Sequence, residues 1–545
     1  MGDNKRLLIA LALSVATILL YPWIYARFFP KPAVVSPSIS INEKPLQKLV
    51  APGAKAAVAA SQPAPVSEEL TTVETPLYTA VFTNRGGGVK SWRLKKYRET
   101  LDKNALPIDI VRPVEGKTTL ESRVLSGGIP ETISFKPSRT IVALDENSRG
   151  AEPLVFVWTS SNGVTIEKSY VFKADSYGID TRLSIINGSK ETLKGSAAAD
   201  LVGIFESADG KGKRLSYHSG PIRRIQGKVV RQKPVEGVES AAGPVEWLGI
   251  EDKYFLSALI PTKDAAMSWE SVVVSSRNTE RVSMYMPVEI KPGEKALLSY
   301  LAFIGPKEYN VLKTQGNRLD ETIEFGWFSF IAKPFLVVLN FFYRFLKNYG
   351  LAIIILTFIT KVLFHPLTKH SMTSMKEMQK IQPQIAVVKE KYKNDREKLN
   401  RELVELYKRY KINPLSGCLP MVLQIPVFLG LYEVLAVAIE LRHAPFFLWI
   451  HDLSAKDPYY ITPVVMGVTM FVQQKTTPTA MDPTQAKMML VMPVVMTFFF
   501  LNFPSGLVLY WLVNNVLSII QQYQIRAGGG SSSASRGPGG SPAKA

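Results

Sequence analysis

The sequence predicts a multi-pass α-helical membrane protein, with an N-terminal anchor and a five-helix core, that carries a large exported all-β sandwich domain. Three observations predict this class. An apolar stretch follows the first basic residues, short alternating segments fill the chain from about Glu74 to Asn310, and further apolar stretches crowd the C-terminal third. The mean hydropathy of +0.06 agrees with soluble and membrane parts joined in one chain of 545 residues.

Residues 1–26 are expected to form a transmembrane anchor. Their apolar stretch follows Lys5 and Arg6, a pattern that cleaved signal peptides and retained anchors share. No small-residue cleavage site follows promptly, and aromatic residues at the end of the stretch resemble an interfacial belt, which favours the anchor. Residues 27–70 are rich in Pro and Ala and are expected to be a linker.

Residues 71–320 are expected to form the β-sandwich domain. Short segments of alternating polarity are separated by turn clusters such as GGG at 86–88, and this spacing is typical of sandwiches. The clearest predicted strands are residues 78–83, 164–172, 179–186 and 281–286. Of the five histidines only His218 lies in this region, which argues weakly against acid-base catalysis there.

Residues 321–349 are expected to form an amphipathic helix in the membrane plane. Lys333, Asn340, Arg344 and Lys347 recur at helical spacing and define a basic face opposite an aromatic one. The alternative is an ordinary span kinked at Pro334. The turn signal that follows at residues 348–350 favours the in-plane helix.

Residues 350–526 are expected to form the five-span core. The predicted spans are approximately residues 351–367, 417–441, 459–474, 488–502 and 507–525, several of them shorter than the ~20 residues that cross a bilayer. The segment 368–415 carries twelve Lys and Arg against six Asp and Glu, which assigns it to the cytoplasm. Both termini are then cytoplasmic and the β domain lies outside. The low-complexity tail, residues 527–545, is expected to be disordered.

The composition excludes several function classes. The formal net charge of +19 could suggest a protein that binds nucleic acid, but the basic segments adjoin apolar spans. We therefore expect the basic residues to contact the lipid bilayer and expect no specific nucleic-acid partner. Cys418 is the only cysteine, so no intrachain disulfide can form. Phosphate-binding loops, paired histidines at metal spacing and a nucleophile elbow are absent from the sequence. We therefore expect no enzyme, no cofactor and no metal.

Residues 369–412 are expected to form a cytoplasmic helical hairpin. Met372, Met375 and Met378 begin an apolar stripe that recurs at steps of three and four, and a second stripe follows a turn at residues 393–395. Two interpretations stay open: the stripes join the two helices, or the methionines form an adaptable surface for apolar ligands.

Lys361 is the candidate for the functional centre, because it is a lone cation in an apolar span, where a charge faces a partner or water. Thr357 lies one helical turn before it. Further polar residues in the spans predict a wet pocket: Thr360, Gln424, Glu433, Asn514, Asn515 and Ser518. Trp511 is three residues from Asn514 and could share a face with it. Lys361 could instead snorkel to the cytoplasmic end or pair with Glu433.

Several runs resemble the YidC/Oxa/Alb family of membrane protein insertases, and in particular its members in Gram-negative inner membranes. The runs are NPLSGCLP (413–420), QIPVF (424–428), LWIHDL (448–453), DPYY (457–460), MGVTM (466–470) and FPSGLVLY (503–510), with NRGGG (84–88) in the β domain. The resemblance covers nearly the whole chain.

This resemblance implies an insertase and membrane chaperone that needs no nucleotide. It would act on nascent membrane proteins, alone or with the Sec translocon, with the ribosome and signal-recognition machinery as further partners. The family's groove holds a cation that attracts acidic tails, and here Lys361 stands where an arginine is usual. The resemblance implies that this groove is lined by Gln424 and Asn514. It also implies an apolar surface along which the substrate's membrane span exits to lipid, and the residues that match this surface are Thr357, Tyr510 and Trp511.

Two other functions remain as alternatives. A small-solute or ion transporter could use the same intramembrane charge, although no convincing internal repeat supports it. A carbohydrate-binding β domain anchored by the spans is the third interpretation.

Overall fold

The computed structural model describes residues 67–102, 104–111, 118–148, 152–204, 218–232, 237–241, 245–262, 270–276, 279–410, 412, 419–477 and 489–528. The chain divides into two compact units, each taken here by itself. The β unit spans 1–96, 109–252 and 257–304, and the helical unit spans 97–108, 253–256 and 305–545. The predicted anchor, most of the predicted linker, Cys418 and nearly all of the C-terminal tail lie outside the described residues.

In the β unit the strand pairs with a described register are antiparallel, except for the parallel pair of β1 and β7. Its strands are β1 (Leu70–Glu74), β2 (Tyr78–Thr83), β3 (Val89–Arg98), β4 (Pro107–Asp109), β5 (Glu121–Ser126), β6 (Lys136–Pro137), β7 (Ile141–Ala143), β8 (Leu154–Thr159), β9 (Val164–Val171), β10 (Gly178–Asn187), β11 (Leu193–Ile204), β12 (Gly220–Ile225), β13 (Lys228–Arg231), β14 (Gly237–Ala241), β15 (Val245–Glu251), β16 (Phe255–Pro261), β17 (Glu270–Ser276), β18 (Thr279–Ile290) and β19 (Lys295–Pro306).

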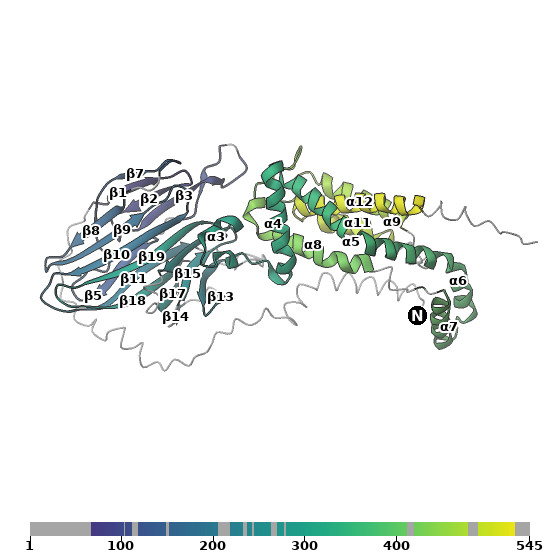
Figure 1. Ribbon diagram of the computed structural model, residues 1–545, viewed down its shortest axis with the longest axis horizontal. Helices are drawn as coiled ribbons and strands as arrows, with labels where there is room; N and C mark the ends of the chain where they lie inside the picture. Colours follow the sequence, from purple (N-terminus) through teal and green to yellow (C-terminus); the bar gives the residue numbers. More distant parts are fainter. Residues whose placement is uncertain are drawn as a thin grey trace, which may run out of the picture. The chain divides into compact units, whose positions relative to one another are not determined.

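These strands form one large sheet and two smaller ones (Figure 1). The nine-stranded sheet has the order β13-β12-β15-β16-β19-β10-β9-β8-β6, and the five-stranded sheets have the orders β4-β3-β2-β1-β7 and β14-β17-β18-β11-β5. Rings of Phe82 on β2 and Tyr170 on β9 pack with centroids 4.9 Å apart. Strands β11, β17 and β18 contact β15 of the large sheet. The two small sheets thus cover one face of the large sheet, and the predicted sandwich is confirmed.

Alternating polarity explains why these segments became strands. Along β9, inward-facing residues alternate strictly with outward-facing ones, and Val164 and Ile166 are fully buried. The predicted strand 78–83 coincides with β2. The predictions at 164–172 and 179–186 differ from β9 and β10 by single residues, whereas β18 extends the predicted strand 281–286 at both ends.

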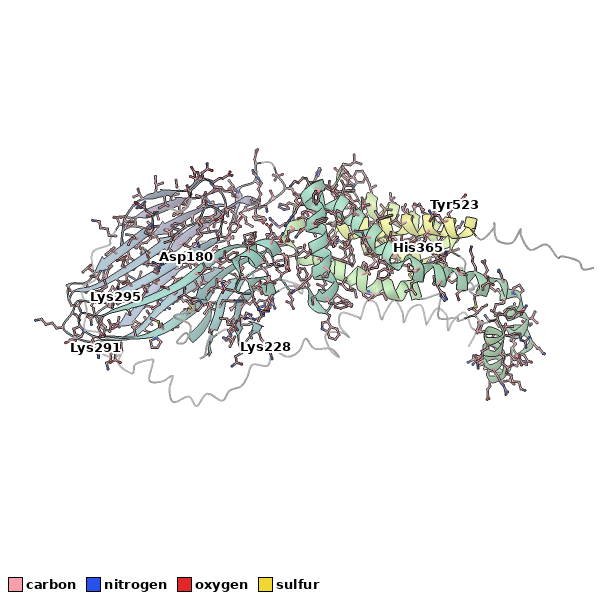
Figure 2. All side chains as sticks on the ribbon, in the orientation of Figure 1. Asp180, Lys228, Lys291, Lys295, His365 and Tyr523 are labelled. Carbon is pink, nitrogen blue, oxygen red and sulfur yellow. The ribbon has the colours of Figure 1, made fainter. Side chains whose placement is uncertain are left out.

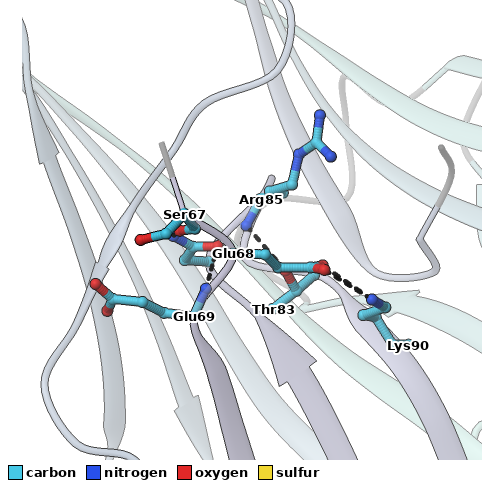
Figure 3. Close-up of polar contacts among 7 residues, drawn as sticks. Ser67, Glu68, Glu69, Thr83, Arg85 and Lys90 are labelled. Carbon is cyan, nitrogen blue, oxygen red and sulfur yellow. Dashed lines mark hydrogen bonds and ion pairs between the residues drawn. The ribbon is translucent and has the colours of Figure 1, made fainter. Parts of the chain in front are cut away.

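The NRGGG run forms the turn after β2 and is fixed from several sides. The side chain of Asn84 accepts the backbone N–H of Glu69 at 3.1 Å. The Glu68 carboxylate accepts a hydrogen bond from Thr83 Oγ1 at 2.8 Å and pairs with Lys90 at 2.9 Å (Figure 3). Gly86 and Gly87 have φ angles of +65° and +56°, which favour glycine. Gly86 and Gly87 therefore provide the left-handed backbone conformation that this turn requires.

A buried lysine lies where the three sheets meet. Val89 on β3 forms a bridge with Thr119, just before β5, so the two small sheets join at this point. Lys168 on β9, fully buried, reaches from the large sheet to this seam, and its ammonium donates to the carbonyls of Gly86 at 3.3 Å and Gly87 at 3.1 Å and to that of Leu120. Burial lowers the pKa of Lys168 to about 7, although the nearby carboxylates of Glu121 and Asp200 act in the opposite direction.

The helical unit follows the last strand. Its helices are α3 (Tyr309–Gln315), η2 (Leu319–Thr322), η3 (Gly326–Phe328), α4 (Ser329–Leu346), α5 (Tyr349–Lys380), α6 (Gln382–Lys391), α7 (Arg396–Arg409), α8 (Leu419–Val437), η5 (Ile439–Leu441), α9 (Ile461–Thr476), α11 (Met492–Phe500) and α12 (Ser505–Gly528). Among described residues, two helical segments are long and apolar enough to cross a membrane, Gly326–Leu346 and Tyr349–Lys380.

The predicted first span and the start of the predicted hairpin lie in one continuous helix. Helix α5 has 32 residues and contains the span predicted at 351–367 and the first part of the hairpin predicted at 369–412, whose remainder lies in α6 and α7. Pro366 lies inside α5 and does not end it, because a helix can accommodate a proline with a local kink. The side chain of Asn348 caps the start of α5 by accepting the N–H of Leu351 at 3.1 Å.

Helix α4 is separate from α5 and runs across the direction of α5 and α8 (Figure 1). Lys347, with a φ of 51°, ends it. The predicted polar face is wrong in one position: Asn340 is buried and accepts a hydrogen bond from the Tyr349 hydroxyl at 2.9 Å. The exposed residues of α4 include aromatic ones, Phe330, Phe341 and Phe345, and Arg344 is exposed as well.

Candidate functional site

The candidate site lies among α5, α8 and α12, which contact one another and run side by side in Figure 1. Lys361 on α5 is half-buried, and its Nζ donates to Ser518 Oγ on α12 at 2.7 Å. In the described part of the chain the ammonium has no other hydrogen bond and no ion pair. The carboxylate of Glu433 lies elsewhere, next to Gly326. The ion pair that the sequence left open is therefore absent among the described residues.

A second set of hydrogen bonds links α8 to α12. The Gln424 amide donates to the hydroxyl of Tyr510, and at 3.4 Å to Asn514 Oδ1. Tyr510 and Asn514 are buried, while Gln424 is half-buried. Because Tyr510 and Asn514 are four residues apart, they lie on one face of α12.

These contacts define a polar stripe on α12, made of Tyr510, Asn514, Ser518 and Gln521. At its far end Gln521 Nε2 lies 2.8 Å from Nδ1 of His365, which follows Lys361 by one turn of α5. Figure 2 shows His365 on α5 beside the end of α12 marked by Tyr523. At 1.5 Å per residue the stripe extends over about 16 Å, roughly half of a ~30 Å hydrocarbon core.

The polar residues predicted to share one pocket in fact separate into two groups. Asn515 faces α9, where its Nδ2 donates to Thr469 Oγ1 at 3.3 Å. Gln522, two turns later, hydrogen-bonds Thr476 and Thr477. Because consecutive residues differ by 100° around a helix, Asn514 and Asn515 serve different partners. Of these two asparagines, only Asn514 belongs to the α12 polar stripe.

Thr357 is buried against its own helix, and Trp511 lies in a cluster of aromatic rings. Thr357 is fully buried, and its hydroxyl donates to the carbonyl of Ile353 at 2.7 Å, so it presents no free donor. The Trp511 ring packs against Phe428 and Phe500, with centroids 5.1 and 5.3 Å away. Trp511 and Asn514 thus both contact α8, through Phe428 and Gln424, which lie one helical turn apart.

Comparisons with known proteins identify the family. The family model described as 60Kd inner membrane protein matches residues 341–530, and the model of the YidC periplasmic domain matches residues 70–338. The membrane protein insertase YidC of Syntrophus aciditrophicus (strain SB) is 44% identical over 96% of this chain and 99% of its own length. That of Geotalea daltonii is 43% identical with the same coverage. The chain belongs to the YidC family of membrane protein insertases.

The resemblance stated from the sequence is thereby confirmed, and with it an inner-membrane protein that has a periplasmic domain. The expectation that the chain is not an enzyme agrees with a family of insertases. A crystal structure of an active YidC insertase with its first transmembrane domain resolved is 18% identical and covers 84% of this chain and 93% of its own, with a TM-score of 0.37.

The hairpin of this YidC-family chain has a core of its own. Met378 packs with Ile381, which lies between α5 and α6, with Ile385 of α6 and with Leu406 of α7. Met372 is also buried, and Met375 is half-buried. For Met378 the contacts agree with the interpretation that the stripes join the helices. Whether Met372 and Met375 meet substrate stays a prediction.

Two residues of the site were missed from the sequence, His365 and Gln521. A signal for both existed, because His365 follows Lys361 by four residues and Gln521 follows Ser518 by three. Among the described residues no group of His, Cys, Asp and Glu is arranged to hold a metal ion.

Proposed function

We propose that this chain is a membrane protein insertase and membrane chaperone that takes nascent apolar segments at the cytoplasmic face and passes them to lipid through the groove that contains Lys361. The observation that carries the proposal is that, among the described residues, this cation hydrogen-bonds only the neutral hydroxyl of Ser518. A charge without an acidic partner in an apolar span can attract an acidic side chain of an incoming tail. Were it paired with a carboxylate, that attraction would be muted.

The α12 polar stripe would shelter the translocated tail. An amide moved into an apolar medium without a partner costs roughly 2–7 kcal/mol, so hydrogen-bonding groups along half of the hydrocarbon core would lower the barrier. Two other helices of this unit are short: α9 has 16 residues and α11 has 9, or about 24 and 14 Å of helix. Short helices favour a locally thin bilayer, which shortens the remaining path.

The driving force in this proposal is apolar burial. When the substrate's apolar span enters lipid, about 25 cal/mol is gained per Å² of surface removed from water, so no nucleotide is needed. The buried Tyr510 and the ring cluster around Trp511 would form the apolar exit beside the stripe.

The remaining parts take their roles from this mechanism. The hairpin with Met372, Met375 and Met378 would meet nascent chains first, because the positive-inside rule assigns it to the cytoplasm. Both termini would be cytoplasmic and the β unit periplasmic. Helix α4, with exposed aromatic residues and Arg344 beside them, would lie in the membrane plane. The chain would act alone or beside the Sec translocon, and receive substrates from the ribosome and the signal-recognition machinery.

Charge reversal at Lys361 tests the proposal. Proteoliposomes with the parent chain or Lys361→Glu would receive two substrates that differ only in an acidic or a neutral tail, and protease protection would report insertion. We expect Lys361→Glu to slow the acidic-tailed substrate about tenfold or more, equivalent to ~1.4 kcal/mol of barrier, and to affect the neutral one little.

The matched control is Lys369→Glu, two turns along the same helix at an exposed position. It makes the same change in net charge outside the groove, so its insertion rates should follow those of the parent. Equal insertion of the acidic-tailed substrate by the parent and Lys361→Glu would refute the proposed attraction.

A further inference from the structure

The hydroxyl of Ser518 is oriented by its own helix. Ser518 is 4% exposed, and its Oγ donates to the carbonyl of Asn514 at 2.8 Å, four residues earlier on α12. A hydroxyl has one proton and two lone pairs, so this bond commits the proton and leaves only acceptor capacity. Lys361 Nζ occupies that acceptor at 2.7 Å. The serine therefore presents a fixed acceptor to the ammonium.

The register of the two helices supports the same contact. One turn further along both, Gln521 Nε2 and His365 Nδ1 lie 2.8 Å apart. Lys361 precedes His365 by four residues, and Ser518 precedes Gln521 by three, so the two contacts bracket one turn of the α5 and α12 interface. This second contact hinders sliding of α5 along α12 and keeps Ser518 at the level of Lys361.

A lysine needs such a partner more than an arginine does. Its ammonium is a compact charge on a flexible stem with four carbons, whereas a guanidinium is a rigid planar fork. Without a fixed acceptor the Lys361 stem could extend toward the end of α5 where His365 lies. A single hydroxyl satisfies one of the three ammonium protons and leaves the others for a second acceptor.

We propose that Ser518 is a positioning residue that holds the Lys361 ammonium inside the groove and directs its remaining protons toward the carboxylates of a translocating acidic tail. This rests on the proposed function and adds to it a residue that governs the preference for acidic tails. Ser518 acts through Lys361, which already occupies its hydroxyl as an acceptor.

A mutant cycle tests the proposal, with the full-length chain in proteoliposomes and the same pair of acidic-tailed and neutral-tailed substrates. Ser518→Ala should slow insertion of the acidic-tailed substrate about tenfold, the loss expected for one hydrogen bond to a charged group, and leave the neutral one unchanged. Ser518→Thr keeps the hydroxyl and should restore most of the rate. In the background of Lys361→Gln, Ser518→Ala should have no further effect.

The control on the same helix is Asn515→Ala, which removes a hydrogen bond to α9 rather than to α5. It should not change the ratio of the two insertion rates. The proposal is overturned, and Ser518 is merely structural, if Ser518→Ala lowers the insertion rates of both substrates equally. The same conclusion follows if Ser518→Thr slows the acidic-tailed substrate as much as Ser518→Ala does.

The failures of the two proposals are distinguishable. If Lys361→Gln leaves the ratio of acidic to neutral insertion unchanged, the proposed function itself is refuted. If Lys361→Gln lowers the ratio but Ser518→Ala leaves it at the parent value, only the positioning role is refuted.

Discussion

Lys168 couples the stability of the β unit to pH. Its pKa is lowered to about 7 by burial, whereas an exposed lysine of an unfolded chain keeps the ordinary value of 10.5. Unfolding between these two pH values therefore takes up a proton. Stability rises with pH wherever the unfolded state binds more protons, so the β unit should become more stable as the pH increases from about 7 toward 10.5.

Replacement of Lys168 by Met removes this proton and keeps an unbranched chain of similar volume. Two of the three carbonyls around the ammonium retain another donor, since the carbonyl of Gly86 accepts Ser122 N–H and that of Gly87 accepts the Tyr170 hydroxyl at 2.6 Å; the Leu120 carbonyl lies 3.3 Å from the same hydroxyl. The variant should therefore fold. One proton changes the free energy of unfolding by about 1.4 kcal/mol per pH unit, so the parent should gain roughly 2 kcal/mol over the variant between pH 7.5 and 9.5.

Pulse proteolysis in urea measures this difference in the full-length protein in detergent, with the fragment of the β unit followed at both pH values. The buried tyrosines near Lys168 are present in both proteins, so their own titration cancels in the comparison. Lys295→Met, at an exposed position on β19 that is labelled in Figure 2, is the matched control and should show no such pH-dependent difference. The reasoning is refuted if parent and Lys168→Met differ by the same free energy at pH 7.5 and 9.5.

Two further substitutions test the packing. Gly86→Ala should destabilise the β unit by about 1–3 kcal/mol in the same assay, because its φ is +65° and an added Cβ would lie 2.5 Å from Glu121 Cγ. Gly127→Ala should leave the stability nearly unchanged, because a Cβ added at Gly127 meets no atom within 4 Å. Equal losses of stability in Gly86→Ala and Gly127→Ala would contradict the argument. Leu406→Ala should speed limited proteolysis of α6 and α7, since loss of a buried leucine costs about 2–5 kcal/mol. Val404→Ala, 50% exposed, is its control, and equal cleavage rates of the two variants would argue against a packed hairpin core.

The sequence was most informative where one short-range period decides the structure. Period-two alternation located β2 and β9 almost to the residue. The same alternation places Lys168 on the inward face together with Ile166 and Tyr170, so a buried cation could have been predicted there. Its partners could not, because they are carbonyls of two turns about 50 and 80 residues away in the chain.

The helical unit shows where local signals are insufficient. The predicted first span ends near Pro366, but α5 continues through this proline to Lys380, since neighbouring contacts decide whether a proline kinks a helix or stops it. The polar residues of α12 predicted a pocket, and their spacing already contains two faces, one with Asn514 and one with Asn515. Which face meets α5 and which meets α9 depends on tertiary packing, and the sequence alone does not supply it.

The partners along the α12 polar stripe suit substrates of varied sequence. Gln424, Asn514 and Gln521 have amides that both donate and accept, and the hydroxyl of Tyr510 does the same. Such groups can exchange a partner within the protein for one on a passing tail with little loss, whatever the tail's polar side chains are. Lys361 differs, because it can only donate and carries a charge. Under the proposed function the stripe would therefore tolerate many polar tails, and the preference among them would come from the one cation that Ser518 holds in place.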